Sequence, residues 1–183
     1  MFWTRRHYYL PLLVIADMDG SYYRILSTKE LISPGGIGID FKTRRLLWVD
    51  STRGFIGSME LNGSEDAKFE MGKHDYLPQH LGLHENGLFV AGSKSTSSGS
   101  SGSGIFFKNA KDGENLVLNF STTTIRSFAV YNSLSQPNYN QESNCKNHPC
   151  PGICLLSGLE SFRCACPTGQ KSLNNGTTCE GEQ

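Results

Sequence analysis

Residues 1 to 144 of this 183-residue chain contain no cysteine, and all six cysteines lie in its last fifth. No apolar run approaches the roughly 20 residues that are needed to span a bilayer. Basic and acidic residues balance at 17 each, so the chain has no strong field for nucleic acid or for an anionic membrane. We therefore expect no nucleic-acid partner, and we expect any membrane anchor to lie outside these residues.

The chain also lacks the motifs that assemble a catalytic site. It has no G-x-S-x-G elbow, no H-E-x-x-H motif and no glycine-rich loop of the kind that cradles phosphate. No window shows a sustained apolar period of 3.6 residues, which argues against a helical protein. We therefore expect an all-β protein that is not an enzyme and that holds no cofactor.

The cysteines themselves occupy 35 residues with the spacing C-x4-C-x3-C-x9-C-x-C-x12-C. A stretch that short buries too little apolar surface to fold alone, so disulfides worth roughly 2–4 kcal/mol each must replace a core. Such density is typical of proteins outside the cytosol, although the spacing alone allows many pairings. The alternative is a zinc site with His148, Cys150 and Cys154 as ligands, which the C-x-C pair and the even count fit poorly.

This segment resembles an epidermal growth factor-like domain. The resemblance covers residues 144 to 180 and includes Phe162, an aromatic residue two positions before the fourth cysteine. The calcium-binding form of that domain has acidic residues just before the first cysteine and an Asn or Asp where Leu156 stands here, so we expect no calcium. The resemblance implies three disulfides, which are Cys145–Cys154, Cys150–Cys164 and Cys166–Cys179.

A repeat with a period of about 43 residues runs through the cysteine-free part. The motif PGGIGI at residues 34–39 recurs 44 residues later as PQHLGL, and 47 residues further on, weakened, as IRSFAV. Asp-Gly or Asn-Gly turns and aromatic strands recur in the same order between these motifs. The period is that of a four-stranded propeller blade.

Short β-rich runs agree with this interpretation, at residues 46–49, 55–61 and 116–120. In the last run Leu116, Leu118 and Phe120 share one face of the expected strand. Asp-Gly and Asn-Gly tolerate the positive φ of tight turns, so they predict strand reversals. The serine- and glycine-rich stretch from Ser95 to Gly104 predicts a flexible loop between two strands.

The repeat resembles the YWTD repeat, also called the low-density lipoprotein receptor class B repeat. Trp3-Thr4 and Trp48-Val49-Asp50 are degenerate copies of its signature. In that family a β-propeller is followed directly by an epidermal growth factor-like domain. We therefore expect part of a propeller in residues 1–137, a linker in 138–143 and the small domain in 144–180. The resemblance also implies that Asp40 and Asp50 tie adjacent blades together by hydrogen bonds.

The length of the chain accounts for about three blades, whereas a closed propeller of this kind has about six blades and roughly 250 residues. We therefore expect either a piece of a longer receptor or a short gene product that folds incompletely alone. Residues 5–16 have an alternative interpretation as a signal peptide, with two arginines before a short apolar run. The repeat explains the same residues, and we favour it.

The resemblance implies the ligand-binding or ligand-release part of an endocytic or signalling receptor, with lipoprotein or Wnt-pathway protein ligands, on the extracellular side of the plasma membrane or in the secretory or endosomal lumen. The alternative is a secreted matrix or growth-factor-precursor protein with the same two domains, as in nidogens. N-x-[ST] motifs at Asn62, Asn119 and Asn175 predict N-glycosylation. His80 and His84 flank the repeat motif and are candidates for acid-triggered ligand release.

Overall fold

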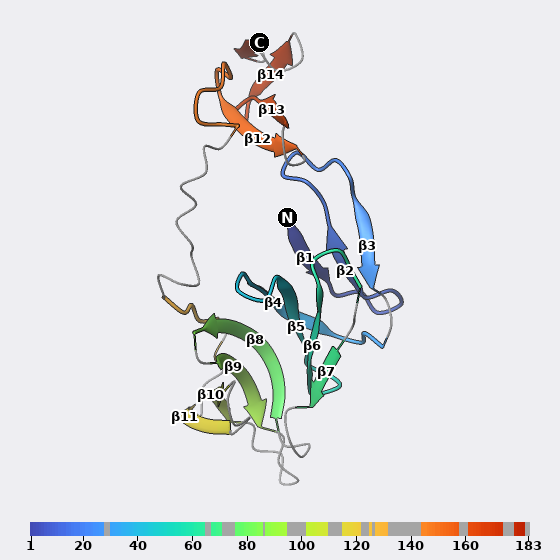
Figure 1. Ribbon diagram of the computed structural model, residues 1–183, viewed down its shortest axis with the longest axis vertical. Helices are drawn as coiled ribbons and strands as arrows, with labels where there is room; N and C mark the ends of the chain where they lie inside the picture. Colours follow the sequence, from blue (N-terminus) through green and yellow to red (C-terminus); the bar gives the residue numbers. More distant parts are fainter. Residues whose placement is uncertain are drawn as a thin grey trace. The chain divides into compact units, whose positions relative to one another are not determined.

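A computed structural model describes residues 1–27, 30–64, 67–70, 76–85, 87–94, 102–109, 115–121, 125, 127–131, 144–157, 161–173 and 178–181. Every regular element in these ranges is a β-strand, which confirms the all-β prediction (Figure 1). Within the same ranges there is no helix that could cross a membrane. The strands are β1 (Phe2–Arg5), β2 (Leu12–Ile15), β3 (Arg24–Ser27), β4 (Pro34–Asp40), β5 (Arg45–Asp50), β6 (Phe55–Glu60), β7 (Ala67–Glu70), β8 (Tyr76–His84), β9 (Gly87–Lys94), β10 (Ser103–Asn109), β11 (Asn115–Ser121), β12 (Ile153–Ser157), β13 (Ser161–Ala165), β14 (Gln170–Leu173) and β15 (Thr178–Gly181).

Each repeat of the sequence forms one sheet in which strands pair in the order of the chain. The orders are β1-β2-β3, β4-β5-β6-β7 and β8-β9-β10-β11. In the two four-stranded sheets every neighbouring pair is antiparallel. Both also carry an irregularity at the proline of the repeat motif, after Pro34 and after Pro78, because proline has no N–H to give to the ladder. The period of the sequence is therefore one β-meander.

The β4–β7 sheet is buried on both faces. Leu46 and Trp48 of β5 lie in one apolar cluster with Leu13 of β2. Val49, from the opposite face of β5, lies in a second cluster with Val90 of β9. Burial on both faces explains why β5 contains a continuous apolar run and why β6 is buried from Phe55 to Met59 without alternation.

The repeated glycine in β4 and β8 makes room for the chain that follows one repeat later. A methyl group on Gly38 of β4 would lie 2.8 Å from Leu81 Cδ1 of β8. At the equivalent Gly82 of β8 it would lie 2.5 Å from Val130 Cγ2. A side chain at either position would therefore push the neighbouring segment away. The glycine recurs because the same close approach recurs.

The end of the serine- and glycine-rich stretch differs from the prediction of a loop up to Gly104. Ser103 and Gly104 are the first residues of β10, where they pair with Ser93 and Gly92 of β9. Ser103 is buried. Residues 95–101 of this stretch, and the expected linker at 138–143, lie outside the described residues. Strand β11 covers the predicted run at 116–120, with an irregular register opposite Ile105 and Phe106.

The chain divides into two compact units. One contains residues 2–14 and 25–137, which hold most of the three sheets. The other contains Met1, residues 15–24 and residues 138–183. In this second unit the hairpins β12-β13 and β14-β15 lie together with the loop that connects β2 to β3.

Candidate functional site

Three disulfides hold the hairpins of the C-terminal part. They join Cys145 to Cys154, Cys150 to Cys164, and Cys166 to Cys179, with Cα–Cα distances of 5.7, 5.2 and 5.6 Å. These distances suit a disulfide. The pairing is the one that the resemblance to an epidermal growth factor-like domain implies. Among the described residues no cysteine is free.

The residues of the alternative zinc site belong to this disulfide core. Ligand atoms of His148, Cys150 and Cys154 lie within 4.8 Å of one another. Both sulfurs are bonded in disulfides, and the Nδ1 atom of His148 accepts a hydrogen bond of 3.0 Å from the N–H of Cys150. A disulfide sulfur is not the thiolate that zinc requires. In this oxidised form the cluster therefore has a structural role.

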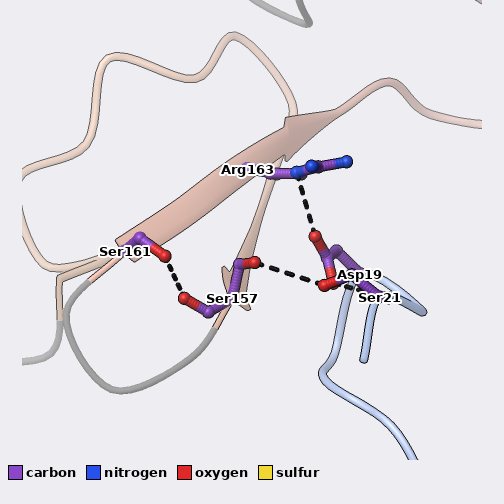
Figure 2. A network of polar contacts seen from close by, with 5 residues as sticks. All are labelled: Asp19, Ser21, Ser157, Ser161 and Arg163. Atoms are coloured by element: carbon purple, nitrogen blue, oxygen red, sulfur yellow. Dashed lines mark hydrogen bonds and ion pairs between the residues drawn. The ribbon is translucent and has the colours of Figure 1, made fainter. Parts of the chain in front are cut away.

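The β2–β3 loop contacts the β12-β13 hairpin through a polar network, which Figure 2 shows. Arg163 Nε lies 3.1 Å from Asp19 Oδ2, and the hydroxyls of Ser21 and Ser157 are 3.4 Å apart. The N–H of Met18 also donates to the carbonyl of Leu156 at 3.2 Å. The contacts between the loop and the disulfide module thus include an ion pair, a contact between hydroxyls and a backbone hydrogen bond.

The network depends on an Asp19 carboxylate that its own turn holds in place. The hydroxyl of Ser21 donates to Asp19 Oδ1 at 2.6 Å, and the N–H of Ser21 donates to the same atom at 2.9 Å. These two bonds hold the pKa of Asp19 below its ordinary value of 3.8, with smaller contributions from Ser157 and Arg163 and an opposing one from desolvation. The side chain of Asp19 is 3% exposed and that of Arg163 is 70% exposed. The site therefore keeps a negative charge at neutral pH.

Asp50, at the end of β5, has a fully buried carboxylate that accepts four backbone hydrogen bonds. Its Oδ2 accepts from Ile32 and Ser33 at 2.8 and 2.9 Å, in the segment that enters β4 from the preceding sheet. Its Oδ1 accepts from Thr52 and Arg53 at 3.1 and 3.0 Å, in the turn before β6. The carboxylate joins the connection between two sheets to a turn of its own sheet.

Asp40, at the end of β4, makes its described hydrogen bonds within one turn. Its Oδ1 accepts from the N–H groups of Lys42 and Thr43 at 2.9 and 3.3 Å, and its Oδ2 accepts from the Thr43 hydroxyl at 2.7 Å. These contacts are local and accessible to solvent. The tying of adjacent blades by Asp40 and Asp50 stays a prediction, with very different local geometry at the two residues.

A basic and aromatic loop connects β1 to β2. Tyr8 and Tyr9 are 89% and 83% exposed, and their rings meet edge to face at 4.9 Å between centroids. The N–H of Tyr9 donates to His7 Nδ1 at 3.3 Å, and Arg6 Nη2 donates to the hydroxyl of Ser51, in the turn after β5, at 3.4 Å. Residues 1–16 contain no acidic side chain. We call residues 6–10 the β1–β2 loop surface.

The remaining predicted site residues are dispersed. Asn62 is exposed in the β6–β7 turn, Asn119 is in β11, and Asn175 lies outside the described residues. His80 lies opposite Ala91 in the β8-β9 pair, and the ring of His84 meets Phe89 edge to face at 5.9 Å. Sequence analysis missed the roles of Asp19, Arg163 and the two exposed tyrosines. Only the Asp-Gly-Ser turn could have signalled the first of these.

No family model matches the chain. The vitellogenin receptor of Solenopsis invicta is 27% identical over 175 residues, which cover 93% of this chain and 9% of the relative. The vitellogenin receptor Yl of Drosophila melanogaster is 29% identical over 183 residues, which cover 98% of this chain and 9% of the relative. Among solved structures, a nidogen/laminin complex matches with a TM-score of 0.49 and 17% identity, covering 65% of this chain and 41% of that chain.

Bladed β-sheets are thus followed by a small module with three disulfides. The fold is a partial propeller of about three blades with an epidermal growth factor-like module. The chain is similar to vitellogenin receptors over more than nine tenths of its length. It spans 9% of the length of each of these two relatives.

Proposed function

We propose that this chain is part of the extracellular portion of an endocytic receptor of the low-density lipoprotein receptor family, in which it takes part in binding and releasing a protein ligand. The observation that carries the proposal is the similarity to two vitellogenin receptors over 93% and 98% of the chain. The name of these relatives gives vitellogenin as their ligand, and a protein of that kind is the first candidate here. The alternative to an endocytic role within the same family is a signalling role with a Wnt-type ligand.

The disulfides support a place outside the cytosol, on the extracellular side of the plasma membrane or in the endosomal lumen. Three bridges within 35 residues need an oxidising compartment to form and persist. In this proposal residues 1–137 are the bladed part, 138–143 the linker and 144–180 the epidermal growth factor-like domain. The chain itself then contributes recognition and not catalysis.

The β1–β2 loop surface supports a protein partner with acidic side chains. Tyrosine and arginine are the residue types that most often dominate the energy of protein interfaces. Here two tyrosines lie more than four-fifths exposed beside Arg5, Arg6 and His7, which are exposed as well. Hydrogen bonds from Tyr9 to His7 and from Arg6 to the next sheet limit the motion of the loop, which lowers the entropy lost on binding.

The test uses the complete receptor that contains this chain, immobilised, with purified vitellogenin, low-density lipoprotein and a Wnt protein as probes. Replacing Tyr8 and Tyr9 together by alanine should weaken binding of the recognised probe by about tenfold or more, since each is placed as an interface anchor. Tyr131→Ala is the matched control, because Tyr131 is 94% exposed but lies elsewhere in the same unit. The affinity of the Tyr131→Ala receptor for the probe should stay within about twofold of that of the unmodified receptor.

The outcomes separate the function from the place of binding. Binding of none of the three probes, together with secretion into the matrix and no uptake by cells, would overturn the receptor function. Binding that the loop variant leaves unchanged would overturn the placement of the ligand on the β1–β2 loop surface. Uptake of bound vitellogenin or lipoprotein into acidic vesicles would support the endocytic role over the signalling one.

A further inference from the structure

The turn between β6 and β7 presents one of the three N-x-[ST] motifs in an ordered and solvent-exposed conformation. Asn62 and Ser64 are exposed, and Gly63 between them has φ of 91°, a left-handed conformation that glycine adopts without strain. The other face of this turn is covered, because a methyl group on Gly63 would lie 3.1 Å from Leu26 Cδ2 of β3. The contact with Leu26 therefore sets which side of the turn points to solvent.

Hydrogen bonds of the turn orient the Asn62 amide. Its Oδ1 accepts from the N–H of Ser64 at 2.8 Å and from the hydroxyl of Ser64 at 2.7 Å. A backbone N–H can only donate, so the oxygen must face Ser64, and the assignment of oxygen and nitrogen in this amide is settled. The Nδ2 atom is on the other side of the amide, where it donates to the carboxylate of Glu60 at 3.2 Å.

This arrangement fits the chemistry of N-linked modification. The acceptor is the amide nitrogen of asparagine in N-x-[ST], and accepted sites are typically on surface turns of secreted proteins. At Asn62 the hydroxyl two residues on is within hydrogen-bond distance of the same amide. The hydrogen bond from the Nδ2 atom to Glu60 is exposed to solvent, so its loss on modification costs little.

We infer that Asn62 is an N-glycosylation site. In the transfer, the Nδ2 atom forms a bond to the anomeric carbon of an oligosaccharide carried on a lipid pyrophosphate. The bond from that carbon to the pyrophosphate oxygen breaks, the pyrophosphate leaves with the electron pair, and the amide loses one proton. The donor and the transferase belong to the secretory pathway, so the inference rests on the extracellular place in the proposed function.

The glycan would occupy one end of the β4–β7 sheet. The turn that holds Asn62 follows β6, whereas the turn that contains Ser51 precedes β6 and lies at the opposite end of that strand. The arginine of the β1–β2 loop surface contacts Ser51. A glycan on Asn62 therefore leaves the proposed ligand surface open and shields the other end of the same sheet.

The test measures the fraction of Asn62 that carries a glycan in the protein purified from the cells that make it. Trypsin cleaves after Arg53 and Lys68, so residues 54–68 form one peptide in which Asn62 is the sole N-x-[ST] asparagine. The expected result is that this peptide carries a glycan. After enzymatic removal of the glycan in heavy-oxygen water, the peptide should contain labelled aspartate at position 62. The peptides with Asn119 and Asn175 are separate and serve as internal comparisons.

Two variants confirm the assignment by different routes. Asn62→Gln removes the acceptor, and Ser64→Ala keeps the acceptor but removes the hydroxyl, so each should lower the mass of the protein by one glycan. An unmodified peptide 54–68 in the natural protein overturns the inference, whether or not a variant folds. If the disulfides are formed in that protein, the failure is limited to Asn62. If the thiols are free, the extracellular location in the proposed function fails as well.

Discussion

Asp50 and Asp40 are the same residue type at the ends of neighbouring strands, and they make opposite predictions for stability. Asn at position 50 keeps one oxygen and replaces the other by an amide that can only donate. That amide would then face two backbone N–H groups, either those of Ile32 and Ser33 or those in the turn before β6. Each buried donor left without an acceptor costs about 1–3 kcal/mol.

Asp50→Asn should therefore lower the free energy of unfolding by about 2–6 kcal/mol, because two donors lose their acceptor in a site with no solvent access. For a domain of this size that corresponds to a fall in melting temperature of roughly 5–20 °C. Asp40→Asn is the matched control. It keeps the acceptor for Lys42 and Thr43, and water can replace the lost oxygen, so its effect should stay within about 0.5 kcal/mol.

The assay is urea unfolding of the secreted chain, followed by tryptophan fluorescence and by circular dichroism. Both variants and the unmodified chain are measured in one buffer, and the slopes of the unfolding curves are compared to check that the denatured states match. If Asp50→Asn costs no more than Asp40→Asn, the inference that buried backbone donors depend on this carboxylate is refuted. A difference of less than about 1 kcal/mol between the two variants would count as that result.

Two further predictions follow from close contacts. Gly57→Ala should destabilise the β4–β7 sheet by about 3 kcal/mol in the same assay, because the new methyl group would lie 2.2 Å from the ring of Trp48. Adding Trp48→Leu should restore part of the lost stability. An unchanged unfolding midpoint for Gly57→Ala would contradict this packing. The lowered pKa of Asp19 means that its contribution is complete above the ordinary value of 3.8 and is lost only as the pH falls through the lower folded value. The amides of residues 17–21 should therefore show the same protection from exchange at pH 7 and pH 5, and protection should decrease only as the pH falls below the ordinary value of 3.8. Asp19→Asn should lack this protection at every pH. A change between pH 7 and pH 5 in the unmodified chain would show that another group controls the contact.

Sequence patterns predicted the features that depend on neighbours along the chain. Asn-Gly and Asp-Gly predicted tight turns, and Gly63 and Gly20 have φ of 91° and 82°. The repeated Pro and Gly positions predicted equivalent strands, and both prolines interrupt their ladders. The prediction of a loop up to Gly104 was wrong at the end of that stretch, because serine- and glycine-rich composition does not reveal that Ser103 pairs with β9.

Other features could not be predicted from spacing. Ser21 and Ser157 are 136 positions apart, and no local pattern connects the β2–β3 loop with the disulfide module. The sequence likewise gave no reason to separate Asp50 from Asp40, because the resemblance assigns both the same role. Their difference arises from burial, which depends on packing between sheets.

The amino-acid sequence by itself determined the β-meander repeat, its turns and the position of the disulfide module, since strand residues, turn residues and cysteine spacing act over a few positions. The tertiary structure decided which polar groups lose their water. Desolvation depends on residues that are distant in the chain, and so the hydrogen bonds of Asp50 and the contact of Asp19 with Arg163 became visible only in three dimensions.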